Sequence, residues 1–270
     1  MNEILISIIV VKYKSEKYLE NCIKSIKKSL KDGKIEIVVV DNDKINIGYG
    51  AGLNKGARIA KGKYLLLLNP DTVMLKNAIE EMYLFLERNP EVAILGPKIF
   101  NNEEKDRQLS FCRFPGPLTA LFVYSPLKST LIGKMFWNYF TYGYAKKNIV
   151  NDQPICVDEV SGAAMMIRKS VFEKIHGFDE NVFMYFEEND LCRRVQRLGY
   201  KIYFDPKAEI IHYGGKSNQD IETSNNYFRK SRDYFFKKHF GMILGNLLNF
   251  FIASMEFIIK TRRSVYKPAK

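Results

Sequence analysis

Three clusters of polar residues have the types and spacing that chemistry requires. Asp41-Asn42-Asp43 follows the apolar run IVVV, Asn69-Pro70-Asp71 follows YLLLL, and FEEND occupies positions 186–190. Parallel strands place their ligands just past their carboxyl ends, so we expect the first two clusters to face one crevice. A carboxylate there can accept hydrogen bonds from a nucleotide base or ribose. A carboxylate that faces a diphosphate can hold Mg²⁺ or Mn²⁺.

The third cluster crowds the carboxylates of Glu187, Glu188 and Asp190 into four positions. Repulsion between them tends to raise the pKa of one carboxylate, and a raised pKa suits a general base. His212 ends the run AEIIHY and is a further candidate ligand, although a lone histidine is more often structural. The sequence contains no Ser-His-Asp spacing, no P-loop and no GxGxxG motif.

Each cluster also has a purely structural interpretation. Asp41, Asn42 and Asp43 are residue types that favour turns. Asp71 or Thr72 could cap a following helix. The arginines that follow the FEEND cluster could pair with its carboxylates along one helix face. On position alone, these alternatives stay open.

Composition limits the class of protein. The chain has 270 residues, of which 46% are hydrophobic and 27% charged, so we expect a packed core in one large domain or two small ones. The four cysteines lie far apart in sequence, which excludes a zinc-type pair and predicts free thiols in a reducing compartment. The first residues, MNEILISIIVVKYK, lack the features of a signal peptide and indicate a buried strand.

The formal net charge of +12 could serve nucleic acid, an anionic membrane face or phosphorylated substrates. The alternative is a solvated, lysine-rich surface. Much of the excess lies in the C-terminal part, where apolar residues separate the basic clusters. That pattern favours a membrane surface over a nucleic-acid groove.

Hydrophobic periodicity predicts alternating strands and helices in the first half of the chain. Strands are expected at residues 4–11, 35–40, 64–68 and 91–100, and helices at 15–30, 52–60 and 72–88, with Ser15 and Thr72 as candidate N-caps. This order predicts an open, mostly parallel α/β sheet.

The second half is less regular. Residues 101–150 show no clear period and could form a flexible substrate loop or a lid. Further on, VSGAAMMIR predicts a strand, KSVFEKI a short helix, and EENDLCRRVQRLGY a helix ended by Gly199. KIYFDP and AEIIHY predict two short strands, and residues 225–239 and 242–260 predict two final helices.

The last apolar stretch, residues 242–259, is about long enough to span a bilayer, which takes roughly 20 residues. Asn246, Asn249 and Glu256 make spanning costly, and both flanks are basic. The pattern favours a helix lying in the plane of an anionic membrane surface. Packing on the rest of the protein or in a homodimer interface is the alternative.

Taken together, these segments resemble family 2 glycosyltransferases of the GT-A fold, especially their rhamnosyltransferase-like branch. The matching runs include SIIVVKYKSEKYLENCIKSI, IEIVVVDND, NIGYGAGLNKGARIAKGKYLLLLNPDT and VSGAAMMIRKSVFEKIHGFDENVFMYFEENDLCRRVQRLGYKIYFDPKAEIIHYGGKS. They occur in family order, and the resemblance extends over about four-fifths of the chain. The resemblance implies a Rossmann-like, mostly parallel open sheet in a catalytic domain over 1–220. Residues 1–100 would bind the nucleotide sugar, residues 101–220 would hold acceptor and catalytic groups, and residues 221–270 would form basic amphipathic helices.

The resemblance also implies roles for single residues. Asp71 would bind a divalent metal, Mg²⁺ or Mn²⁺, that bridges the donor diphosphate, and His212 would complete the metal site. Glu188 falls where the family has its catalytic base, usually an Asp, and Asp190 matches the next acidic position. The residues implied to contact the nucleotide or donor sugar are Tyr13, Asp41, Asn46, Asn69, Asp71, Ser161 and Gly162. The family usually has Asn where this chain has Lys12 and Lys14, whose ammonium groups could hold phosphate or lie exposed.

The implied function is an inverting glycosyltransferase of cell-surface polysaccharide synthesis that uses a nucleoside diphosphate sugar, with dTDP-rhamnose favoured. Its acceptor would be a glycan or a lipid-linked glycan. The protein would be cytoplasmic and peripheral on the inner face of the membrane. A non-catalytic nucleotide-sugar or glycan-binding module with a decayed site is the alternative. Net charge alone favours a nucleic-acid-binding protein, but no nucleic-acid motif accompanies it, so we expect no such partner.

Overall fold

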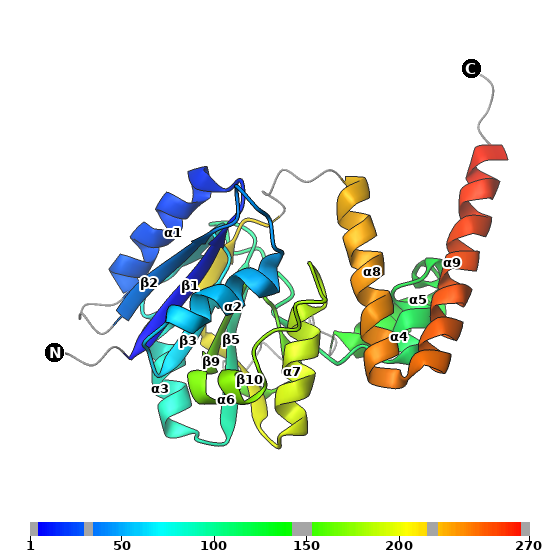
Figure 1. Cartoon of the computed structure of the whole chain (residues 1–270). Coiled ribbons are helices and arrows are strands. Elements are labelled where there is room, and N and C mark those ends of the chain that lie inside the picture. Colours follow the sequence, from blue (N-terminus) through cyan, green and yellow to red (C-terminus); the bar gives the residue numbers. More distant parts are fainter. Residues whose placement is uncertain (1–4, 30–34, 142–152, 215–220, 266–270) are drawn as a thin grey trace.

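The computed structural model describes residues 5–29, 35–141, 153–214 and 221–265, with side chains as far as residue 258. Figure 1 shows a twisted sheet covered by helices on both faces. A group of helices, formed by α4, α5, α8 and α9, stands beside it. The sheet supplies the edge on which the candidate site is built, and the helical group contacts that site from one side.

The central sheet has the strand order β2-β1-β3-β9-β5-β10-β4, with β7 paired to β10. Its strands are β1 (Ile6–Lys12), β2 (Ile35–Asp41), β3 (Tyr64–Leu68), β4 (Thr72–Met74), β5 (Val92–Phe100), β7 (Ile155–Cys156), β9 (Ala164–Arg168) and β10 (Lys201–His212). β2, β1 and β3 are parallel, as are β5 and β10, whereas β9 runs antiparallel between β3 and β5. The expected open, mostly parallel α/β sheet is confirmed.

Helices cover the two faces of the sheet because each presents an apolar stripe at helical spacing. Buried side chains of α1 and α3 join those of the strands on one face, and side chains of α2, α6 and α7 join them on the other. The bounds are α1 (Glu16–Ser29), α2 (Tyr49–Ile59), α3 (Ala78–Arg88), α6 (Lys169–Lys174) and α7 (Glu187–Arg197). α2 lies so close to β1 that a Cβ added at Gly56 would sit 2.4 Å from Ile9 Cγ2.

Two elements differ from the sequence prediction. Thr72 does not cap a helix: it begins β4, which pairs with β10, and α3 starts only at Ala78 after Asn77. The two short strands expected around Pro206 form one strand, β10, with a register shift between Asp205 and Glu209. Proline lacks an N–H for the ladder, so the strand bulges there and then continues.

The segment expected to form a loop or a lid contains turns and a short strand up to residue 116, and helices from Pro117 to Phe140. Residues 101–141 contain β6 (Phe111–Cys112), paired with β8 (Glu159–Val160), then α4 (Pro117–Phe122), the 3₁₀ helix η1 (Pro126–Ser129) and α5 (Leu131–Phe140). Residues 142–152 lie outside the described part of the chain. Thr130 caps α5 by accepting a hydrogen bond from the Gly133 N–H.

Two long helices end the chain, as expected: α8 (Ile221–Phe240) and α9 (Met242–Val265). Gly241, with φ of 88°, ends α8, and Gly245 lets α9 approach the Lys237 backbone closely. Both helices share an apolar core with Phe186, the residue that precedes α7. In the described residues, no helix is both long enough and apolar enough to cross a membrane. The expected domain boundary at residue 220 falls in 215–220, outside the described residues.

All four cysteines are unpaired, as their spacing predicted. Cys22 and Cys192 are buried, Cys112 is half-buried and Cys156 is exposed on β7.

Candidate active site

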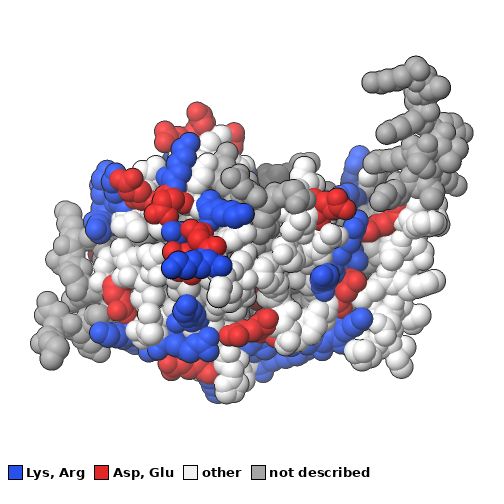
Figure 2. All heavy atoms as spheres, turned by 45° about the horizontal axis from the view of Figure 1, so that its top comes forward, with Lys and Arg blue, Asp and Glu red and all other residues white. Residues whose placement is uncertain are grey.

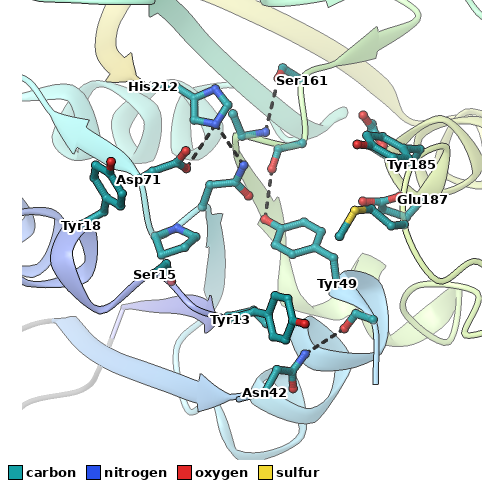
Figure 3. A pocket seen from close by; sticks show the side chains of 18 of the residues that line it. Tyr13, Ser15, Tyr18, Asn42, Tyr49, Asp71, Ser161, Tyr185, Glu187 and His212 are labelled. Atoms are coloured by element: carbon teal, nitrogen blue, oxygen red, sulfur yellow. Dashed lines mark hydrogen bonds and ion pairs between the residues drawn. The ribbon is translucent and has the colours of Figure 1, made fainter. Parts of the chain in front are cut away.

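A cavity of about 340 Å³ opens at the carboxyl edge of the parallel strands. Its walls come from the segments after β1, β2 and β3, the turn before β9, the end of β10 and the start of α7. Figure 3 shows Asp71 and His212 on one side, Glu187 and Tyr185 on the other, and Tyr49 between them. Its lining residues are Val11, Tyr13, Ser15, Tyr18, Asn42, Asn46, Gly48, Tyr49, Asn69, Pro70, Asp71, Ser161, Gly162, Ala163, Met184, Tyr185, Glu187, Glu188 and His212.

The turn after β2 meets the cavity through Asn42 and Asn46 rather than through Asp41. Asn42 donates a hydrogen bond to the Gly48 carbonyl (3.1 Å), and the Asn46 side chain accepts one from the Gly48 N–H (3.0 Å). The Asp41 side chain is 56% exposed, lies outside the cavity lining and pairs with Lys12. Tyr13, at the end of β1, lines the cavity as expected.

The Lys12 ammonium group is held by three carboxylates. Its Nζ lies 2.7 Å from Glu16, 3.1 Å from Asp43 and 3.4 Å from Asp41. Hydrogen bonds to Glu16 and then Asp43 raise the pKa of Lys12 above its usual range. The chain therefore already neutralises this charge, and neither interpretation of Lys12 fits: its ammonium group is paired with carboxylates, and its side chain is only 15% exposed.

Asp71 and His212 converge at one wall of the cavity. Asp71 Oδ1 lies 3.3 Å from His212 Nε2, and both side chains are nearly buried. Asn69 Nδ2 is 3.2 Å from the same nitrogen, and Gln108 Oε1 is 3.0 Å from Nδ1. If Nδ1–H donates to Gln108, the lone pair of Nε2 faces the cavity and the Asp71 carboxylate. A carboxylate oxygen and an imidazole nitrogen are both ligand types for divalent cations, but the described residues contain no cluster of three or more His, Cys, Asp or Glu side chains that could hold one. The hydrogen bond between the ring and Gln108 fixes the orientation of His212.

Backbone hydrogen bonds fix the turns that carry these side chains. The Asn69 N–H donates to the Ala163 carbonyl (2.9 Å), and the Tyr213 N–H donates to the Asp71 carbonyl (3.1 Å). The Tyr49 hydroxyl, on α2, donates to the Gly162 carbonyl (3.1 Å). The NPD turn, the Ser161–Ala163 turn and the start of α2 therefore form one connected frame.

Glu187 and Glu188 occupy the first turn of α7 and line the opposite wall. Burial raises the pKa of both carboxyl groups, and the neighbouring charge of Glu188 raises that of Glu187 further. One oxygen of each is buried without a hydrogen-bond partner in the described residues. Buried polar atoms normally have partners, so these two oxygens are suited to a group that enters the cavity.

The segment before α7 is held in an unusual conformation. Tyr185 and Phe186 have φ angles of 68° and 67°, which non-glycine residues rarely adopt. The Ser231 hydroxyl of α8 donates to the Met184 carbonyl (2.7 Å), and the Tyr49 N–H donates to the Phe183 carbonyl (3.1 Å). Such conformations persist where surrounding contacts enforce them, often at functional sites.

Asp190 does not line the cavity, although the sequence placed it with Glu188. Its buried carboxylate lies 2.7 Å from Arg194, 2.6 Å from Lys238 and 2.8 Å from His239. Burial alone would raise its pKa, but the hydrogen bond from His239 and the cations Arg194 and Lys238 hold it well below the usual range. The structural alternative of a helix-face ion pair therefore applies to this member of the cluster.

Three contributors to the site were not assigned from the sequence. The Ser15 hydroxyl is buried at the cavity without a described partner, and only its backbone carbonyl accepts hydrogen bonds from α1. Tyr49 lies in the NIGYGAGLN run, whose small residues predicted a helix but gave no indication that the Tyr49 side chain would line the cavity. Gln108 lies in the segment without periodicity, where no sequence signal marked it as the partner of His212.

The family model for glycosyltransferase like family 2 matches residues 3–232. The chain belongs to glycosyltransferase family 2. Curated relatives of this glycosyltransferase include the low-salt glycan biosynthesis hexosyltransferase of Haloferax volcanii, 30% identical over 85% of this chain and 74% of the relative. The rhamnosyltransferase WbbL of Escherichia coli is 26% identical over 80% of this chain and 86% of its own length. The resemblance seen in the sequence is confirmed.

Solved structures with the same fold include GalNAc-T7 with UDP, GalNAc and Mn²⁺ (TM-score 0.59, 15% identity). They also include a mannosyltransferase from Pyrobaculum calidifontis with GDP-Man and Mn²⁺ (TM-score 0.56, 13% identity). The matches cover 87% and 85% of this chain but only 50% and 61% of those chains. At these identities the likeness establishes the GT-A fold, as the sequence predicted.

Proposed function

We propose that this glycosyltransferase transfers a sugar from a nucleoside diphosphate sugar, with inversion, to a hydroxyl of a glycan or lipid-linked glycan. The observation that carries the proposal is one cavity with an Asp71–His212 donor pair on one wall and the unpaired Glu188 carboxyl group on another. Relatives named as hexosyl- and rhamnosyltransferases support the reaction class, and they favour a hexose or a deoxyhexose such as rhamnose. The NPD form of the motif at residues 69–71 is our reason for favouring dTDP as its carrier.

Asp71 and His212 would hold a divalent cation, Mg²⁺ or Mn²⁺. Bound there, the ion would neutralise the negative charge of the diphosphate leaving group. Two protein ligands suit a hard cation that also binds phosphate oxygens and water. Mn²⁺ in the two structural neighbours supports this part of the proposal.

The residues of the chain itself orient the reactants and move one proton. Asn42, Asn46 and Tyr13 line the part of the cavity after β1 and β2, where the nucleoside would lie. The acceptor oxygen attacks the anomeric carbon of the donor sugar. The bond between that carbon and the diphosphate oxygen breaks, the nucleoside diphosphate leaves, and Glu188 takes the proton of the acceptor hydroxyl. A pKa raised by burial suits Glu188 to that role. One displacement of this kind inverts the anomeric centre.

Gly162 and Glu188 lie close together, since a Cβ added at Gly162 would sit 3.5 Å from Glu188 Cδ. A glycine there leaves space for a reacting sugar beside the base. Asp41 and Asp190, both outside the cavity lining, fit supporting roles: Asp41 holds Lys12, and Asp190 anchors α7 to α8.

The test is turnover of a panel of nucleotide sugars with Mn²⁺ or Mg²⁺, with the anomeric configuration of the product read by NMR. Asp71→Ala should abolish turnover and weaken Mn²⁺-dependent binding of the nucleoside diphosphate in calorimetry. Asp106→Ala, in an exposed turn, is the matched control and should leave both unchanged. Near-normal turnover by Asp71→Ala would overturn the metal assignment. Tight donor binding without turnover by the unaltered protein would support the binding-module alternative instead.

A further inference from the structure

Helix α9 is apolar on two opposite faces. Leu248 and Ile252 are buried against α4 and α8 in the core that contains Phe186. Ile243, Leu247 and Phe250 follow each other at helical spacing and are 80%, 62% and 74% exposed. A helix with a single buried stripe should be polar on its outer face, so the second apolar stripe requires another explanation.

The exposed apolar surface extends beyond α9. Met242 and Leu244 are exposed where α8 turns into α9, and Leu131, Ile132 and Met135 are exposed on α5. α5 and α9 both pack on α4 and η1, so they belong to the same end of the molecule. Figure 2 shows the α9 end as a white, uncharged surface bordered on its inner side by charged side chains. Exposed apolar side chains that lie next to one another in this way mark interaction sites.

Two polar side chains of α9, Asn249 and Glu256, contact α8 and keep α9 against the protein. Asn249 Nδ2 donates to the Asp233 carbonyl, and Glu256 pairs with Arg229 (3.1 Å) and Arg232 (3.7 Å). The helix therefore has one face committed to the protein and only its outer face available. A helix in this position can lie along a membrane surface and insert only its outer, apolar side chains.

Two partners could cover this apolar face, an anionic lipid surface or a second copy of the chain, and the charge of the segment distinguishes them. Residues 221–270 contain ten Lys and Arg against three Asp and Glu, a net +7 of the +12 of the chain. Exposed lysines also stand on η1 (Lys128) and α5 (Lys134). Two copies of such a segment would repel each other, whereas an anionic lipid surface would attract it.

We propose that the exposed face of α9, together with the exposed residues of α5, docks this protein onto an anionic lipid bilayer. The apolar side chains enter the boundary between headgroups and acyl chains, and exposed lysines such as Lys128 and Lys134 meet the lipid charges. The inference concerns binding alone and does not depend on which sugar or acceptor the enzyme uses.

The test is co-sedimentation of the full chain with phosphatidylcholine vesicles that contain or lack phosphatidylglycerol. We expect binding only to the anionic vesicles, weakened by added salt. The double variant Ile243→Gln/Phe250→Gln should lower the partition coefficient by about tenfold or more. The matched control Ile59→Gln/Leu198→Gln removes two exposed apolar side chains from α2 and the end of α7 and should bind as the unaltered protein does.

Thermal unfolding checks that each variant is folded, and sedimentation velocity reports the oligomeric state. Absence of binding to anionic vesicles, or equal binding by the α9 variant, would overturn the proposal. A dimer that the α9 variant converts to a monomer, without vesicle binding, would assign this face to a second copy of the chain.

Discussion

Two neighbouring glutamates at the start of α7 differ in what they can do, although burial raises the pKa of both. Glu188 lies beside Gly162, where the reacting sugar is placed in our proposal. Glu187 lies under the additional influence of the Glu188 charge, which opposes its ionisation. The place of Glu188 beside Gly162 makes it the better positioned of the two to take the acceptor proton in our proposal.

Glu188→Gln should lower kcat by about a hundredfold or more while the KM for the donor stays nearly constant. The amide keeps the size and the hydrogen bonding of the side chain but cannot take the acceptor proton. Steady-state kinetics with the best donor of the panel measures this. Glu173→Gln, on the exposed side of α6, is the control. An unaltered rate would move the base role to Glu187.

The raised pKa of Glu188 also sets a pH dependence. An ordinary glutamate ionises near 4.5, and burial shifts the folded-state value upwards, so the basic form is reached only at higher pH. The rate kcat/KM should therefore rise with pH through a pKa above 4.5, and this rise should be absent in Glu188→Gln. A rate that is already constant from the ordinary glutamate range upwards would contradict the assignment.

The sequence located some of these residues well and others poorly. Asp71, Asn69 and His212 follow or end strands, and strand ends in a parallel sheet converge, so their proximity could be predicted. Asp190 was placed wrongly because it follows Glu188 by two residues, about half a helical turn, so it faces α8 while Glu188 faces the cavity. The partner of Asp190, His239, is about fifty residues away in sequence.

The contact between α7 and α8 links the cavity wall formed by Glu187 and Glu188 to the group of helices α4, α5, α8 and α9. Asp190 lies at its centre, and Lys238 also pairs with Asp179 (2.6 Å). Phe186 adds an apolar contact to the same junction. The position of Glu188 therefore depends on how α8 is seated.

Asp190→Asn should lower the free energy of unfolding by about 2–4 kcal/mol, because it leaves buried cations without their carboxylate. Denaturant unfolding measures the loss. Glu20→Gln, which removes an exposed pair with Lys24 on α1, should change stability by less than about 1 kcal/mol. If both variants lose equally little, the Asp190 network contributes no more than a surface ion pair.

Over the whole molecule, the sheet end was predictable from periodicity and the helical end only in part. β1, β3 and β5 are buried on both faces and alternate with one-sided helices, so their positions could be predicted. Residues 117–140 gave no period because α5 is apolar on its packed side, at Phe140, and on its open side, at Leu131 and Met135. Hydrophobic periodicity predicts a helix only where one side is apolar and the other polar, so it could not predict α5.

The thiols give the natural chain a ready attachment point for a reporter. Burial raises the pKa of Cys22 to about 11 and that of Cys192 and Cys112 well above the ordinary thiol range, so these thiols stay protonated; Cys22 and Cys192 are buried and Cys112 is half-buried. Cys156 alone is exposed, on a strand that pairs with β10. A maleimide dye would therefore couple most readily at Cys156 without mutagenesis, and it would sit on β7, beside the strand whose far end carries His212. Fluorescence from a single molecule could then follow nucleotide arrival directly.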